Sequence, residues 1–242
     1  TTEIYTLSLH DALPICQSTL ASSLRTSLIF DPPDGRIPPR TTAGERIMAQ
    51  REEQARLRGG RFDAVENNQL SDRCIIMGGA GPPMMNMVYN SNYQIVQSRD
   101  YVMFLIEMIH DARIIPLDGR EQADANVRQW MGTSRGHWEG DTLVVETANF
   151  NGKNPIRGST ENMIVTERFT RVDDETIVYR FTIDDASMWT RPWSAELPMK
   201  KTIGPLFEHA CHEGNYGLYN TLVGARREER LAAEAAAALK SN

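Results

Sequence analysis

Short runs of β-forming residues separated by turns fill the second half of the chain. The clearest is TIVYRFTI (176–183), in which every second residue is aliphatic or aromatic, as in a strand with one buried face. Such runs predict strands at 91–97, 100–110, 112–116, 134–139, 142–149, 162–172, 176–184, 189–197 and 203–210. Their close spacing, with hairpin turns at WEGDT and VDDET, predicts an antiparallel sandwich or barrel instead of an alternating α/β fold.

Two helices are predicted outside this region. In TTAGERIMAQREEQARLRGG, Thr42 and Glu45 have capping-box spacing, and the charged composition predicts a surface helix. YGLYNTLVGARREERLAAEAAAALK is helical by propensity, and because its apolar stripe weakens beyond Leu222, we expect only its first half to pack. The predicted segments are an irregular lead-in with one helix (17–87), a β-barrel domain (88–216) and a C-terminal helix (217–242), preceded by residues 1–16.

Charge and composition exclude several classes of function. The chain carries a formal net charge of −6 without a cluster of Lys and Arg, which argues against a nucleic-acid partner. The longest apolar stretch, YVMFLIEMI, is interrupted by Glu107, so no integral membrane segment is predicted. The absence of a Gly-rich phosphate loop argues against nucleotide-binding classes.

The first fifteen residues, TTEIYTLSLHDALPI, resemble the translation of a sequencing-library adapter, codon for codon. They also lack the basic stretch and apolar run of a signal peptide. We therefore treat residues 1–16 as non-native and exclude three residues from the candidate chemistry: His10, Asp11 and Cys16. We expect this segment to be poorly packed and a native strand to be missing before residue 17. Residues 17–30 or the IYTLSL run could occupy its place.

Three carboxylates fall on apolar faces of the predicted strands. Glu107, Glu146 and Glu167 each lie two or four residues from apolar residues of the same predicted strand, which places them on the same face. A carboxylate on an apolar face is costly unless it is paired or faces a wet cavity. Two explanations stay open: a bulge or register error in the predicted strands, or an internal polar site.

The candidate site residues lie in three polar strings that contain histidine: IHDARIIPLDGR, SRGHWEGD and EHACHEGNY. Histidine titrates near neutrality, and neighbouring carboxylates and arginines can set its tautomer and pKa, as general acid–base catalysis requires. The candidate catalytic residues are His110, Asp111, Arg113, Arg135, His137, Glu139, Asp141, His212 and Glu213. In the alternative, each histidine only caps a turn and bonds to the backbone.

Metal and cysteine chemistry are further alternatives. We expect no cofactor, but His110, His137 and His212 are candidate ligands for a divalent metal, although they lack the helical HExxH spacing. Cys74 and Cys211 are predicted to be two buried thiols, with a disulfide in an oxidising compartment as the alternative.

Longer strings carry a resemblance to a known family. They are, in order, SLIFDPPDGRIPP, DRC, YQIVQ, EMIHDARIIPLDGR, SRGHWEGDTLVVETANF, ERFTRV, WTRPW and FEHACHEGNYGL. Together they resemble a family of exported bacterial proteins of acidobacteria and sphingomonads, to which no reaction is assigned. The resemblance implies periplasmic export and implies that a signal peptide and a DLSGxW-like strand precede the native part in a longer chain. Such a strand before an antiparallel meander is similar to lipocalin-like barrels, a likeness of fold alone.

We therefore predict a mainly β protein, an antiparallel meander β-barrel of lipocalin-like type, that binds a small-molecule ligand. Aromatic and Met residues, Trp138 and Met103 among them, would suit an apolar cavity or simply form the core. If the protein is an enzyme, we expect hydration, isomerisation or elimination, with one histidine as the base and Arg113 or Arg135 stabilising an oxyanion. The alternatives are a metal-dependent hydrolase or oxidase, and a non-enzymatic envelope or interaction protein.

Overall fold

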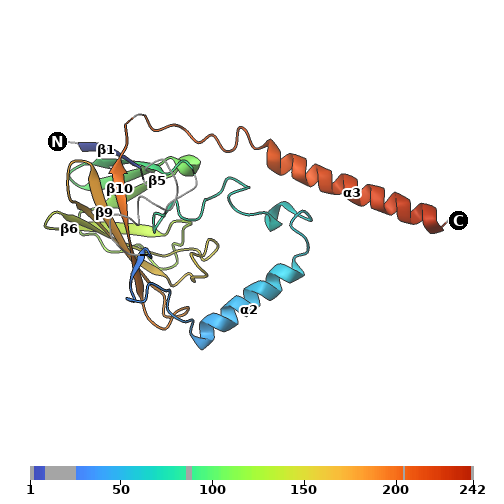
Figure 1. Cartoon of the computed structure of the whole chain (residues 1–242), viewed down its shortest axis with the longest axis horizontal. Coiled ribbons are helices and arrows are strands. Elements are labelled where there is room, and N and C mark those ends of the chain that lie inside the picture. The colour runs from blue at the N-terminus through green and yellow to red at the C-terminus, as the bar shows by residue number, and fades with distance from the viewer. Residues whose placement is uncertain (1–2, 9–25, 86–88, 204, 241–242) are drawn as a thin grey trace.

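Antiparallel strands form one large sheet, and two long helices lie outside it (Figure 1). The computed structural model describes residues 3–8, 26–85, 89–203 and 205–240. The strands are β1 (Glu3–Ser8), β2 (Ile29–Asp31), β3 (Asn92–Gln97), β4 (Tyr101–Ile106), β5 (Ala112–Pro116), β6 (Thr133–Glu139), β7 (Thr142–Ala148), β8 (Ile164–Arg171), β9 (Thr176–Asp184) and β10 (Trp193–Lys201). The helices are α2 (Thr42–Leu57) and α3 (Tyr216–Lys240), with short 3-10 turns η1 (Val65–Asn67) and η2 (Met108–His110). The predicted mainly β fold with two helices is confirmed.

The sheet is a meander that curves until its edges approach. Its order is β5-β4-β3-β1-β10-β9-β8-β7-β6, and β2 pairs with β10. The edge strands β5 and β6 come so close that a Cβ atom on Gly136 would stand 2.9 Å from Cγ2 of Ile115. Within the described residues no backbone ladder joins these two strands, so strand pairing does not close the sheet into a barrel.

The core lies inside the curve, on one face of the alternating strands. The predicted apolar face of β9 is confirmed, because Tyr179, Phe181 and Ile183 are at most 1% exposed. Aromatic rings with centroids 4.8–5.9 Å apart follow one another through this core: Phe104, Phe169, Tyr179, Phe181, Trp193 and Trp189. Alternation along each strand therefore places one continuous aromatic row inside the sheet.

Three predicted strands differ from the observed ones by more than two residues. The run predicted at 100–110 ends at Ile106, because Glu107 turns to helical backbone angles, and Ile109 and His110 then adopt left-handed ones. The strand predicted at 189–197 begins four residues later, at Trp193. The described part of 203–210 forms no strand, and Ile203 is fully exposed; the preceding strand β10 is already paired on both sides, by β1 and β9.

The three carboxylates on apolar faces separate into two cases. The buried face of β4 carries the even-numbered residues, so the face assigned to Glu107 was wrong; this residue lies beyond the strand, is 2% exposed and accepts a hydrogen bond from Nδ2 of Asn92 at 2.5 Å. The face assigned to Glu146 was also wrong, because this residue pairs with Arg135 on the outer, partly exposed face of the sheet. Glu167 is buried inside the sheet. An error in the predicted strands therefore explains Glu107 and Glu146, whereas Glu167 is a polar group in the interior.

Residues 3–8 form a central strand, contrary to the expectation that the first sixteen residues would be poorly packed. β1 lies between β3 and β10, with Glu3 opposite Gln97 and Leu7 opposite Lys201. The described part of the IYTLSL run, residues 4–8, thus forms a strand between β3 and β10, while residues 9–16 lie outside the described residues. Strand pairing joins backbone groups, so it depends less on the side chains of a segment than packing in a core does.

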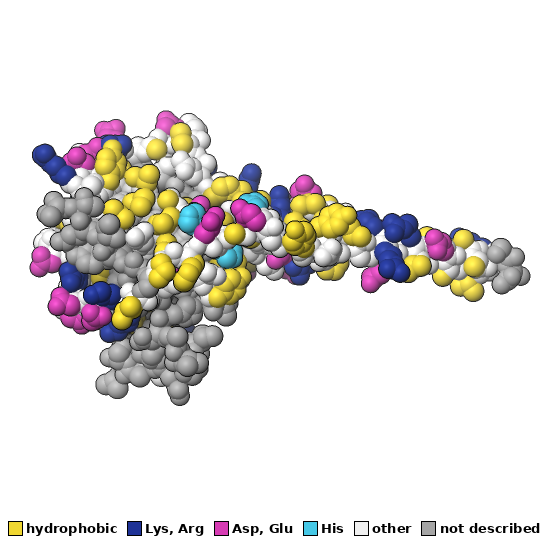
Figure 2. All heavy atoms as spheres, turned by 90° about the horizontal axis from the view of Figure 1, so that it is seen from above, with side chains coloured by type: hydrophobic (Ala, Val, Ile, Leu, Met, Phe, Trp, Pro, Cys, Tyr) yellow, Lys and Arg dark blue, Asp and Glu magenta, His cyan; other side chains and the backbone are white. Residues whose placement is uncertain are grey.

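The two helices are surface elements. The N-cap of α2 is Thr41, one residue before the predicted capping box, and its hydroxyl oxygen accepts a hydrogen bond from the Gly44 backbone at 2.9 Å. Helix α3 projects away from the sheet and has no buried residue (Figures 1 and 2). As expected, its first half packs in part, because Leu218 and Leu222 are half-buried, whereas residues 227–240 are all exposed. Among the described residues no helix has the length and apolarity to span a membrane.

Candidate functional site

A cavity of about 440 Å³ opens among the turns at one end of the sheet. Its wall is apolar and comes from strands β3, β4, β6, β7, β8 and β9: Ile95, Val102, Phe104, Trp138, Leu143, Phe169 and Ile177. Its rim is charged: Asp141, Arg171, Asp173, Asp174, Glu175 and Lys201. Concave sites of about 300–1,000 Å³ with apolar walls and a few polar groups are typical of small-molecule pockets.

Strand alternation explains why this end of the sheet is hollow. Trp138 and Leu143 face each other across the β6–β7 pair, and both line the cavity. Trp138 is 45% exposed at the mouth, next to the turn where β6 ends and β7 begins. Deeper in, the rings of Phe104 and Phe169, with centroids 4.9 Å apart, form the base of the cavity.

A buried ion pair lies beneath this base. Nη2 of Arg113 on β5 donates to Oε2 of Glu167 on β8 at 2.6 Å, and the two side chains are 3% and 0% exposed. The Tyr179 hydroxyl donates to Oε1 of the same carboxylate at 2.8 Å and accepts from the Met84 backbone at 2.9 Å. Burial, and then the nearby Glu167 charge, raise the pKa of Tyr179 well above its usual value, so it stays a neutral donor.

Hydroxyl groups extend this network to the other edge of the sheet. The Arg113 guanidinium also donates to Ser134 on β6 and Thr147 on β7, each at 3.3 Å. A buried charge with several hydrogen-bond partners is tolerable, whereas one without them is costly. Arg113 thus connects the edge strand β5 to the far edge of the curved sheet, where no backbone ladder does so.

The network and the cavity are separate layers. Phe104 contacts both, since its ring centroid is 5.8 Å from the Arg113 guanidinium carbon and it also lines the cavity. Phe169 stacks on Tyr179 at 4.8 Å and lines the cavity as well. Arg113, Glu167 and Tyr179 do not line it. The ion pair therefore supports the aromatic base of the cavity from below and is out of reach of its contents.

The predicted residues of the SRGHWEGD string lie mostly on the outside of the sheet. Nε2 of His137 lies 3.2 Å from Oε1 of Glu139, and Arg168 donates to the other oxygen of that carboxylate. The guanidinium of Arg168 and then His137 lower the pKa of Glu139. Arg135 pairs with Glu146 on the outer face. Of this string's candidates, only Asp141 lines the cavity.

The other two strings lie at separate places. His110 is in η2 and Asp111 follows it, where burial raises the pKa of the Asp111 carboxyl. His212 and Glu213 are exposed in the turn before α3. Across the described part of the chain, no three His, Cys, Asp or Glu side chains are grouped so as to hold a metal ion. The three candidate metal ligands therefore do not form a shared site.

Several residues of the cavity and its base were not predicted as site residues. One sequence signal indicated a polar residue inside the sheet: Glu167 alternates in phase with apolar residues of its strand. Its partner Arg113 was already among the candidate catalytic residues. Phe104, Phe169 and Tyr179 were not distinguishable from ordinary core residues, because their pattern is the pattern of any half-buried strand.

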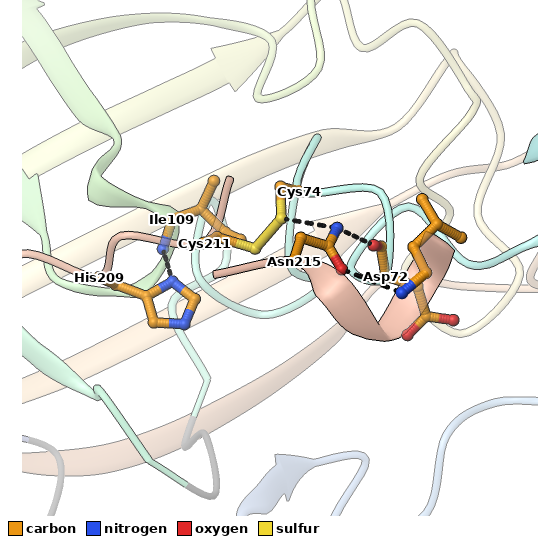
Figure 3. The surroundings of a disulfide bond; sticks show 7 residues. Asp72, Cys74, Ile109, His209, Cys211 and Asn215 are labelled. Atoms are coloured by element: carbon orange, nitrogen blue, oxygen red, sulfur yellow. Dashed lines mark hydrogen bonds between the residues drawn. A yellow bond between two sulfur atoms is a disulfide. The ribbon is translucent and has the colours of Figure 1, made fainter. Parts of the chain in front are cut away.

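A disulfide attaches the tail before α3 to the lead-in segment (Figure 3). Cys74 and Cys211 are joined across 137 residues. The prediction of two buried thiols was therefore wrong, and the alternative, a disulfide, is observed. Beside it, the Ile109 backbone donates to Nδ1 of His209 at 3.1 Å, and Asn215 donates to the Asp72 carbonyl at 2.7 Å. His209 thus has the turn-bracing role that was the alternative to catalysis.

Reduction of the disulfide is expected to release residues 205–240 and leave the sheet folded. None of these residues is buried, so few contacts other than the disulfide hold the segment. Hydrogen exchange should rise toward that of an unfolded chain in this segment alone, in reduced protein and in Cys211→Ser. An unchanged exchange pattern in both, with the disulfide absent by mass spectrometry, would contradict this expectation.

Comparisons with known proteins add nothing to this geometry: no family model, no curated protein and no solved structure matches the chain.

Proposed function

We propose that this protein binds a small, largely apolar molecule in the cavity at the turn end of the sheet. One observation carries the proposal: an opening of about 440 Å³ has an aromatic and aliphatic wall and a charged rim. Filling such a space with apolar atoms removes both ligand and wall from water, which is the main favourable term in binding of this kind. The buried Arg113–Glu167 pair supports the proposal, because it holds the base of the cavity in place.

The placement of the histidines favours binding over acid–base catalysis. A general base must reach its proton within hydrogen-bond distance of a bound substrate. None of His110, His137 and His212 lines the cavity, and His137 is exposed on the outer face of β6. His137 contacts Glu139 at 3.2 Å, and His110 and His212 lie in turns. Binding without histidine chemistry is therefore the function that the geometry supports best.

We also propose a lipocalin-like use of the fold and an exported location. The meander order and the close approach of β5 and β6 support a container open at one end. The Cys74–Cys211 disulfide supports an oxidising compartment such as the periplasm, because disulfides persist in such compartments and are rare in reducing ones.

Ile177→Trp is expected to weaken the binding of a neutral apolar probe, 1-naphthylmethanol, by about tenfold or more, because the larger side chain fills the cavity and displaces the probe. Equilibrium dialysis with the full chain measures the affinity. The matched control is Ile114→Trp, at a residue that is 63% exposed on the outer face of β5 and should leave binding unchanged. If the native chain does not bind the probe, or if both variants bind it equally well, the proposal fails.

A further inference from the structure

The cavity mouth has an unbalanced set of charges. Four carboxylates and two cations line it: Asp141, Asp173, Asp174, Glu175, Arg171 and Lys201. Both cations already lie beside carboxylates, since Arg171 pairs with Asp174 at 3.0 Å and Lys201 lies 3.5 Å from Glu175. Two negative charges, those of Asp141 and Asp173, are thus left in excess at the entrance.

The surroundings of Asp173 keep it ionised. Its carboxylate accepts a hydrogen bond from the Glu175 backbone at 2.8 Å. This bond first, then the Thr176 hydroxyl and the charge of Lys200, lower the pKa of Asp173. Lys200 lies outside the lining and donates to Thr176, so it reduces the negative potential at the mouth without reversing it.

Asp141 lies between the aromatic wall and solvent. It occupies the β6–β7 turn three residues after Trp138, and both residues line the cavity. Asp141 is exposed, and within the described residues no Lys or Arg forms a salt bridge with it. A carboxylate and an exposed indole that line the same cavity are a favourable setting for a cation, which both the negative charge and the face of the ring attract.

We propose that the cavity selects an apolar ligand that carries a positive charge, such as an aromatic or alkyl amine or quaternary ammonium. The apolar body would occupy the space between Phe104, Phe169 and Leu143, with the cationic group at the mouth near Asp141 and Trp138. This inference rests on the proposed function, since a charge preference requires that the cavity bind a ligand. It excludes fatty acids and other apolar anions as the preferred class.

Simple electrostatics sets the size of the expected effect. One unit charge at about 6 Å in a water-like dielectric changes affinity by roughly threefold. Two excess charges should therefore favour a cation over a neutral molecule of the same shape by about tenfold, and disfavour an anion by a similar factor. The preference should shrink with added salt, because charges at an exposed mouth are screened.

Three probes of one skeleton test the proposal: 1-naphthylmethylammonium, 1-naphthylmethanol and 1-naphthoate. Equilibrium dialysis with the full chain at low and physiological salt should rank them cation, neutral, anion. Asp141→Asn should reduce the preference for the cation over the neutral probe about threefold. Glu66→Gln, which removes a carboxylate from the exposed lead-in segment, is the matched control and should leave this preference unchanged.

The outcomes separate this inference from the proposed function. If the neutral probe binds and Ile177→Trp blocks it, but all three probes bind equally or the anion binds best, the charge preference is overturned and the cavity function stands. If the neutral probe does not bind at all, the proposed function fails and this inference fails with it. An Asp141→Asn variant that keeps the native preference for the cation over the neutral probe also overturns the inference.

Discussion

Replacing Glu167 by glutamine is expected to lower the free energy of unfolding by about 3–5 kcal/mol, although the side chain barely changes in size. The substitution leaves the Arg113 guanidinium, which is 3% exposed, without its negative partner. The Tyr179 hydroxyl still has an acceptor in the amide oxygen, so the lost charge is the main change. Urea denaturation followed by circular dichroism measures the effect.

The matched control is Glu146→Gln, which breaks an ion pair of the same type on the outer face. Nη2 of Arg135 lies 2.6 Å from Oε1 of Glu146, but the two side chains are 42% and 41% exposed. Water screens such a pair, so the expected loss is below about 1 kcal/mol. Replacing both buried partners together, by Arg113→Met and Glu167→Leu, should recover most of the stability. Equal small losses in Glu167→Gln and Glu146→Gln would contradict the structural role given to the buried pair.

Deletion of residues 1–16 is expected to abolish cooperative unfolding and to cause self-association. The deletion removes β1 from the middle of the sheet, with six residue pairs to β3 and two to β10. At roughly 0.5–1.5 kcal/mol for each backbone hydrogen bond, this loss is comparable with the whole stability of a domain, about 5–15 kcal/mol. It also leaves two unpaired strand edges, which can pair with other chains. Thermal denaturation and light scattering after gel filtration measure both effects.

The control for this deletion is the chain with Ile4→Val and Leu7→Val, which keeps the β-propensity of the segment. It should unfold cooperatively and remain in the same assembly state as the starting chain. If the chain without residues 1–16 unfolds at the same temperature as the starting chain and has the same assembly state by light scattering, β1 is not an integral strand of the sheet.

The strands could be predicted from the sequence because their signal is local. Alternation in TIVYRFTI predicts both the strand and its buried face, and the hairpin turns predict antiparallel neighbours. The prediction failed at 203–210, whose described residues form no strand although their propensity is adequate, because local propensity does not show whether a partner strand lies within reach. The sequence also did not show whether the sheet closes. Side chains of β5 and residues of β6 come close together, but among the described residues no backbone hydrogen-bond ladder joins the two strands.

The candidate site was less predictable, for a related reason. The polar strings that contain histidine were predicted to carry catalytic residues, yet surface turns and ion pairs have the same composition. His137 shows this, since its partner Glu139 is on the outer face of the same strand. The cavity wall instead comes from six strands, each of which contributes one or two ordinary core residues. No short sequence window contains such a site.

The sequence by itself determined the mainly β class, most of the strands, the two surface helices and, through parity, one carboxylate inside the sheet. The tertiary structure alone decided that Glu167 meets Arg113, that Cys74 meets Cys211 and that a hollow remains above Phe104 and Phe169. The physical reason is the range of the interactions. Backbone propensity and side-chain alternation act between near neighbours in the chain, whereas ion pairs, disulfides and cavities depend on how distant segments meet when the sheet curves.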